Sequence, residues 1–211
     1  MSNPPVIGPG EFFPVVGVGP HEKPWPTDDY FDPELLEHGD RRNVLDKYRY
    51  WKVESIVADL DSKRHPLSIA IENWQHDLNI GSVVRTANAF NVSSIHIVGK
   101  RDWNRRGAMV TDKYLHVIHH PSVSDFQKWS LDNSCPIIGI DNVPGSLPLE
   151  KAELPARCVM FFGQEGSGMS AEAIDVCSVI YEIAQYGSTR SMNASAAAAI
   201  AMYAWGIQNI H

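Results

Sequence analysis

The chain has 211 residues, of which 44% are hydrophobic and 20% charged, and a formal net charge of -7. This length and composition suit one globular α/β domain with an extension, and no apolar run approaches the ~20 residues that a membrane span requires. The amino terminus lacks the basic start and apolar core of a secretory signal, so we expect a cytoplasmic protein without a membrane segment.

Residues 1–31 are rich in proline and glycine and show no sustained periodicity, so we expect an extended arm. The arm is acidic, because residues 1–40 hold eight acids and one lysine and so account for the whole net charge. Residues 32–64 are expected to be a helical extension that begins near Asp32 and Pro33 and breaks near Gly39. Its predicted apolar stripe comprises Val44, Leu45, Tyr48, Trp51, Ile56, Val57 and Leu60.

Residues 65–211 alternate short apolar runs with helical segments, which predicts a mainly parallel sheet covered by helices on both faces. The expected strands are 67–71, 94–98, 115–118, 136–140, 158–162 and 179–183. The expected helices are 80–90, 123–131, 170–176 and an alanine-rich helix that follows residue 191. Ligands of such sheets bind beyond the carboxyl ends of the strands, so the loops there are the place to look for a site.

Three of these loops have unusual sequences. In NWQHDLNIGSVVR, Asn79 and Gly81 open a helix that carries Arg85 on an otherwise apolar face, where an arginine needs an anion or a structural ion pair. In FFGQEGSGMS, three glycines surround Glu165 and indicate positive φ angles or a close ligand, although a tight turn has the same signature. In GSTRSMNAS, Ser191 and Asn193 are also candidates for plain helix caps.

Basic residues form two clusters in the neutral part of the chain. One contains Arg41, Arg42, Lys47, Arg49 and Lys52, and the other contains Lys100, Arg101, Arg105, Arg106 and Lys113. The second also holds Trp103 and Tyr114, a mixture of charge and aromatic rings that is typical of RNA-binding surfaces. The alternative is an ordinary solvated surface.

Together, in this order, the three loops resemble the three motifs of the SpoU family of S-adenosylmethionine-dependent RNA 2'-O-ribose methyltransferases, within the SPOUT superfamily. The matching residues are Asn79, Gly81, Arg85, Thr86 and Ala87, then Phe162, Gly163, Glu165, Gly166 and Gly168, and finally Ser191, Met192, Asn193 and Ser195. The resemblance covers residues 66–210 approximately. It implies an α/β fold with a deep carboxyl-terminal trefoil knot, a rare exception among protein chains.

The resemblance also implies S-adenosylmethionine as cofactor, an RNA substrate and a homodimer in which the alanine-rich helix contributes to the subunit contact. Cofactor-binding residues would be Gly163, Gln164, Glu165, Gly166, Ile183, Gln185, Gly187, Met192 and Asn193. Catalytic residues would be Arg85, Asn79, Glu165, Asn193 and Ser191, with RNA held by Lys100, Arg101, Arg105, Arg106, Lys113, Arg41 and Arg42. No metal is expected, because the three cysteines are widely spaced.

The family usually has Ile-Pro-Met where this chain has Ile183-Ala184-Gln185, a change at a turn that the resemblance places against the cofactor. Transfer RNA is the favoured substrate, and ribosomal RNA is the alternative. A second alternative is a non-catalytic RNA-binding or assembly factor with the same fold. A nicotinamide-dependent oxidoreductase is disfavoured, because an early G-x-G-x-x-G fingerprint with its following acid is missing.

Overall fold

The computed structural model describes residues 17–75 and 79–210. The first half of the expected acidic arm, residues 1–16, therefore lies outside the described residues. The chain divides into two compact units, residues 1–58 and 59–211, and the division falls inside helix α2 (Val53–Asp61).

In the first unit, residues 17–31 pair with the segment that follows them. Val18 forms an antiparallel bridge with Asp40, and Phe31 forms one with Trp51. Between them lies helix α1 (Pro33–His38), which begins after Asp32 and ends at Gly39, as the sequence predicts. The Asp32 side chain accepts a hydrogen bond from the Glu34 N–H, and Gly39 has a φ of 89° that favours glycine.

Residues 40–52 do not continue the predicted helix, apart from one 3-10 turn, η1 (Asp46–Tyr48). The buried Asp40 carboxylate explains this difference, because it accepts hydrogen bonds from the backbone N–H groups of Arg42 (3.0 Å) and Tyr50 (3.0 Å). A side chain that occupies these donors competes with a helical backbone. The predicted stripe is wrong at Leu45, which is 68% exposed.

The second unit contains a seven-stranded sheet in which every pair of neighbours is parallel, in the order β3-β2-β1-β6-β4-β7-β5. Its strands are β1 (His65–Asn73), β2 (Val92–Gly99), β3 (Val117–His120), β4 (Ile137–Ile140), β5 (Leu147–Pro148), β6 (Cys158–Phe162) and β7 (Val179–Glu182). The parallel α/β fold is thus confirmed. The sequence missed only the two-residue edge strand β5 and placed β3 two residues early.

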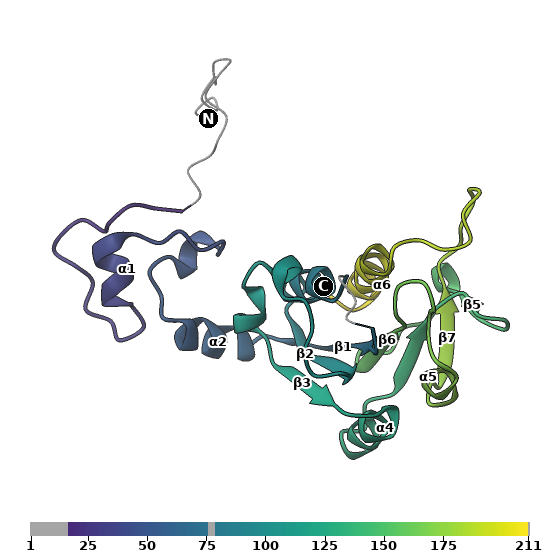
Figure 1. The fold of residues 1–211 in the computed structure, drawn as a ribbon. Coiled ribbons are helices and arrows are strands. Elements are labelled where there is room, and N and C mark those ends of the chain that lie inside the picture. Colours follow the sequence, from purple (N-terminus) through teal and green to yellow (C-terminus); the bar gives the residue numbers. More distant parts are fainter. Residues whose placement is uncertain (1–16, 76–78, 211) are drawn as a thin grey trace. The chain divides into compact units, whose positions relative to one another are not determined.

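Helices cover both faces of this sheet (Figure 1). Helices α3 (Asn79–Ala89) and α6 (Ala194–Asn209) pack with Leu67, Ile69 and Ile71 of β1 in one core cluster. Helices α4 (Val123–Asp132) and α5 (Ala171–Asp175) pack on the other face, where Ala70 of the same strand points. The side chains of a strand alternate between faces, which explains this division.

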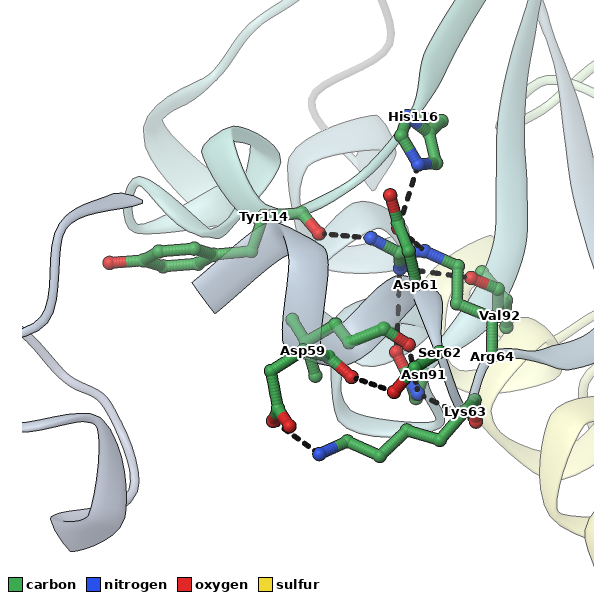
Figure 2. A network of polar contacts seen from close by, with 10 residues as sticks. Asp59, Asp61, Ser62, Lys63, Arg64, Asn91, Val92, Tyr114 and His116 are labelled. Atoms are coloured by element: carbon green, nitrogen blue, oxygen red, sulfur yellow. Dashed lines mark hydrogen bonds and ion pairs between the residues drawn. The ribbon is translucent and has the colours of Figure 1, made fainter. Parts of the chain in front are cut away.

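Arg64 joins three segments of the second unit at the amino-terminal edge of the sheet (Figure 2). Its guanidinium donates to Asp61 Oδ1 (2.6 Å), to the Tyr114 carbonyl (2.8 Å) and to the Val92 carbonyl (3.3 Å). The side chain is 7% exposed, and His116 also contacts Asp61 at 2.8 Å. Because the five N–H groups of a guanidinium form a rigid fork, one arginine can satisfy several carbonyls at once.

Among the described residues, no helix is long and apolar enough to cross a bilayer.

Candidate active site

The three unusual loops meet at one point beyond the carboxyl ends of the strands. Glu165 Oε2 accepts hydrogen bonds from Asn79 Nδ2 (2.9 Å), from the Ala194 N–H (3.0 Å) and, at 3.4 Å, from Asn193 Nδ2. Asn193 Nδ2 also donates to Asn79 Oδ1 (2.8 Å). Residues 79, 165 and 193 are far apart in sequence, so this contact unites all three motifs around one carboxylate.

Asn193 has a second role, because it is the N-cap of α6. Its Oδ1 accepts hydrogen bonds from the Ser195 N–H (3.0 Å) and the Ala196 N–H (3.4 Å). Helix capping, the simpler reading of this residue, is therefore observed alongside its contact with Asn79. The cap fixes the orientation of the amide that reaches Glu165.

The glycine loop after β6 excludes a side chain at Gly163 and needs unusual backbone angles at Gly166 and Gly168. A Cβ placed on Gly163 would lie 2.1 Å from the Gly168 carbonyl carbon and 2.2 Å from the Met169 nitrogen. Gly166 and Gly168 have φ angles of 87° and 68°, which L side chains rarely adopt. The glycines thus permit a tight loop, closed by paired hydrogen bonds between Gln164 and Gly168 (3.0 and 3.1 Å).

Acceptors from neighbouring strands hold this loop in place. Glu72 of β1 is fully buried and accepts hydrogen bonds from the Ser170 N–H (2.8 Å) and the Trp74 indole (2.8 Å). Asp141, which follows β4, accepts from the Met169 N–H (2.7 Å). The Gln164 side chain in turn accepts from the Trp74 N–H (3.0 Å). Residues at the strand ends therefore hold the loop in this conformation.

Beside the loop lies a pocket of about 420 Å³, a volume typical of small-molecule sites. Of the predicted cofactor-binding residues, Gly163, Gln164, Glu165, Gly166, Ile183, Gln185 and Met192 line it. Gly187 and Asn193 do not, although Asn193 contacts Glu165 at its edge. Ser191, predicted as catalytic, also lines the pocket.

Asp141 and Asn142, which were not predicted from the sequence, contribute to the pocket from the loop after β4. Asn142 Nδ2 donates to the Arg190 carbonyl and so connects this loop with the segment before α6. The predicted strand 136–140 could have revealed them, because the loop that follows a parallel strand lies at the same edge of the sheet as the other site loops.

Arg85 is exposed on α3 and does not line the pocket. Within the described part of the chain it forms no hydrogen bond or ion pair, so a structural ion pair with these residues, the alternative left open by the sequence, is not observed. Because the guanidinium stays in contact with solvent, it pays no desolvation penalty and needs no ion-pair partner.

The basic loop that follows β2 lies at the same edge of the sheet. Asn73, at the end of β1, donates through Nδ2 to the carbonyls of Lys100 (2.8 Å) and Asp102 (2.9 Å). Arg105 forms an ion pair with Asp112 at 3.2 Å and lies 5.3 Å from the Trp103 ring centroid. Lys100, Arg101, Arg106 and Lys113 are exposed and form no ion pair with other described residues.

The two predicted RNA-binding arginines of the first unit differ. Arg42 donates through Nε and Nη2 to the Asp40 carboxylate at 2.9 and 2.7 Å, so the fold of its own unit uses this guanidinium. Arg41 is exposed and has no ion pair among the described residues. Of the two, Arg41 is the better candidate for contact with a polyanion.

Helix α6 presents large apolar side chains to solvent. Ile200, Tyr203 and Ile207 are 42%, 63% and 62% exposed and recur at helical spacing on one face. Ala198, in contrast, is fully buried in the core of the chain. The expectation that this helix contributes to a subunit contact stays a prediction, and it concerns the exposed face rather than the buried Ala198.

The chain shares its sequence pattern with known methyltransferases. A family model described as the SpoU rRNA Methylase family matches residues 66–203. A tRNA (guanosine(18)-2'-O)-methyltransferase of Borreliella burgdorferi is 26% identical over 180 residues, which cover 82% of this chain and 79% of that protein. An uncharacterized tRNA/rRNA methyltransferase of Mycolicibacterium vanbaalenii is 25% identical over 74% of this chain, which spans 51% of that relative.

Solved structures share the fold at lower identity. The A. aeolicus TrmH/SpoU tRNA modifying enzyme has a TM-score of 0.65 at 19% identity, over 74% of this chain and 81% of that one. The SpoU methyltransferase AviRb of Streptomyces viridochromogenes, solved in complex with the cofactor AdoMet, has a TM-score of 0.63 at 21% identity, over 71% and 63%. The chain therefore belongs to the SpoU methylase family, whose members are RNA 2'-O-methyltransferases that use S-adenosylmethionine.

Proposed function

We propose that this chain transfers a methyl group from S-adenosylmethionine to a ribose 2'-hydroxyl of transfer RNA. The observation that carries the proposal is the meeting of Asn79, Glu165 and Asn193 at the rim of a glycine-lined pocket. The Borreliella relative, which this chain matches over most of its length, supports tRNA as the substrate and makes guanosine 18 the first position to test.

The pocket suits a cofactor with both an apolar ring and a polar, charged tail. Ile140, Phe162 and Ile183 give it apolar walls, while Asp141 and Gln185 add polar groups. Backbone at Gly163 and Gly166 offers hydrogen-bonding groups that no Cβ shields. When bound, S-adenosylmethionine supplies the methyl group on a positively charged sulfur, which is the electrophile of the transfer.

The residues of the chain must then orient the 2'-oxygen and stabilise the charge that develops on it. Arginine has a pKa above ~12 and is an unsuitable general base at neutral pH. Arg85 is therefore assigned to orient the 2'-oxygen and its neighbouring phosphate, with the hydroxyl proton leaving to that phosphate or to solvent. The hydrogen bonds of Glu165 and Asn193 hold the three loops together at the rim of the pocket while the RNA is bound.

Because Arg85 points to solvent outside the pocket of its own chain, we assign it to the pocket of a second copy. The exposed apolar face of α6 supports a homodimer, since such faces mark interaction sites. A dimer interface there would cover Ile200, Tyr203 and Ile207. The trefoil knot expected for the family remains part of this proposal.

The function is tested by incubating the 211-residue protein with S-adenosylmethionine and unmodified tRNA and analysing the nucleosides by mass spectrometry. We expect a 2'-O-methyl nucleoside, and its absence from tRNA but presence in treated rRNA would favour the ribosomal alternative. Calorimetry with millimolar S-adenosylmethionine separates an enzyme from a non-catalytic RNA-binding factor, since a protein that binds no cofactor is not a methyltransferase.

Arg85→Lys should lower kcat at least tenfold, because lysine lacks the planar fork that holds oxygen and phosphate together. Arg157→Lys, at an exposed position near the opposite edge of the sheet, is the matched control and should retain full activity. Near wild-type turnover by Arg85→Lys would show that this geometry is unnecessary.

The dimer is tested with the double variant Tyr203→Glu, Ile207→Glu, which should sediment as a monomer, whereas Leu131→Glu on α4 should not change the association state. At a concentration of S-adenosylmethionine well below the Kd of Gly163→Ala, a mixed dimer of Arg85→Ala and Gly163→Ala subunits should be more active than either variant alone. No recovery in a verified mixed dimer would place Arg85 at the pocket of its own chain.

A further inference from the structure

The basic loop after β2 carries two apolar residues in an unusual conformation. Met109 and Val110 have φ angles of 48° and 68°, and their side chains are 58% and 56% exposed. A left-handed backbone is a genuine outlier for a β-branched residue such as valine. Two consecutive residues of this kind, both facing solvent, gain nothing from core packing.

The loop holds this conformation through its own contacts. Thr111 Oγ1 donates to the Ala108 carbonyl (2.6 Å), and these two residues, on either side of Met109 and Val110 in the chain, are buried. The Lys113 N–H donates to the Val110 carbonyl (3.3 Å). Strained backbone that the surroundings enforce is concentrated at ligand-contacting sites.

Positive charge on either side of Met109 and Val110, the apolar tip of the loop, indicates the chemistry of its partner. Arg106 and Lys113 are exposed and have no ion-pair partner among the residues that the structure describes. Cations beside a small apolar surface complement a chain of phosphates that carries planar bases. They fit RNA better than a protein surface, where unpaired cations would lose solvation.

The loop is fixed directly to the helix that carries Arg85. A Cβ on Gly81 of α3 would lie 2.8 Å from the Ala108 nitrogen and from the Asn104 carbonyl oxygen, and one on Gly107 would lie 2.8 Å from the Ser82 nitrogen. Backbone therefore meets backbone at this seam. A ligand that binds to Met109 and Val110 is therefore held at a fixed position relative to α3.

We propose that Met109 and Val110 contact the face of an unpaired base in the substrate RNA, while Arg106 and Lys113 bind its phosphates. Apolar side chains, methionine among them, are used in this way by proteins that unstack bases. The inference rests on the proposed function and adds the part of the RNA that this loop recognises.

The test uses the double variant Met109→Ser, Val110→Gly of the 211-residue chain and measures binding to an unmodified tRNA transcript and to a fully paired RNA duplex. We expect the Kd for tRNA to rise roughly fivefold to tenfold, the lower part of the range for removing the stacking on one base, and the Kd for the duplex to stay unchanged. Glycine adopts positive φ freely, so the melting temperature should not fall. Leu131→Ser, which removes another exposed apolar side chain, is the matched control.

Salt dependence separates the two kinds of contact. Arg106→Ala with Lys113→Ala should reduce the slope of log K against log salt by about 0.7 for each phosphate that the variant no longer neutralises, while the tip variant should leave that slope unchanged. Equal weakening on tRNA and duplex, or wild-type affinity of the tip variant, would overturn the inference while leaving the proposed function intact. A wild-type protein that binds neither RNA nor S-adenosylmethionine would overturn both.

Discussion

Gly163→Ala is the sharpest test of the pocket. The added Cβ would lie 2.1 Å from the Gly168 carbonyl carbon, whereas real Cβ contacts stay beyond 3.0 Å, so the backbone must open by roughly 0.9 Å. That movement breaks the paired hydrogen bonds between Gln164 and Gly168. Two backbone hydrogen bonds contribute about 1–3 kcal/mol together.

The closed conformation of the glycine loop is then destabilised by the same free energy. Because about 1.4 kcal/mol corresponds to a factor of ten, the Kd for S-adenosylmethionine should rise between about fivefold and 150-fold. Isothermal titration calorimetry measures this value, and thermal unfolding shows how much of the protein remains folded.

Gly187→Ala is the matched control, because a Cβ there would meet nothing within 4 Å and Gly187 does not line the pocket. Its Kd should equal that of the wild type, even though the family resemblance assigns Gly187 to the cofactor. A Gly163→Ala protein that binds the cofactor with wild-type affinity would refute the argument from loop closure.

Three further variants test stability. Asp40→Asn should lower hydrogen-exchange protection in residues 17–58 by about 2–3 kcal/mol. Burial alone would raise the Asp40 pKa, but hydrogen bonds from Arg42 and Tyr50 outweigh burial and lower it. The stabilisation from the ionised carboxylate is therefore lost only as pH falls through the folded-state pKa. Burial, with nearby His120, lowers the His96 pKa to about 3, so below about pH 6.5 the unfolded chain binds a proton that the folded chain excludes. Urea titrations should therefore show the free energy of unfolding falling from about pH 6.5 towards pH 3, and falling less steeply in His96→Asn. Arg64→Ala leaves the Tyr114 and Val92 carbonyls without their donor and should cost about 2–3 kcal/mol in urea unfolding, and a decrease below about 0.5 kcal/mol would contradict the role assigned to it.

Most of the sheet could be predicted, because a parallel strand that is buried on both faces needs a continuous apolar run. The run Cys158–Phe162 gave the bounds of β6 correctly. The edge strand β5 (Leu147–Pro148) could not be found this way, since two half-exposed residues produce no such run. The helix predicted through residues 40–52 failed because one carboxylate, that of Asp40, occupies the backbone donors.

The candidate site was predictable in part for the same topological reason. Asn79, Glu165 and Asn193 all follow strands, and parallel strands bring their carboxyl ends to one edge. Which side of α3 Arg85 faces could not be read from the apolar pattern, because Arg85 borders the buried stripe and turns outward. Nor could the outer face of α6, since an alanine-rich helix gives no strong contrast between its sides.

The Asn-x-Gly step at the start of α3 links the two halves of the site. Asn79 reaches Glu165 and Asn193 at the pocket, and Gly81, half a turn further, lets the backbone of the basic loop approach the helix closely. Neither residue could perform the other's task, since the first task requires an amide that both donates and accepts and the second requires a residue without a Cβ. The spacing of these two residues thus places the proposed cofactor pocket and the proposed RNA-binding loop beside a single helical turn.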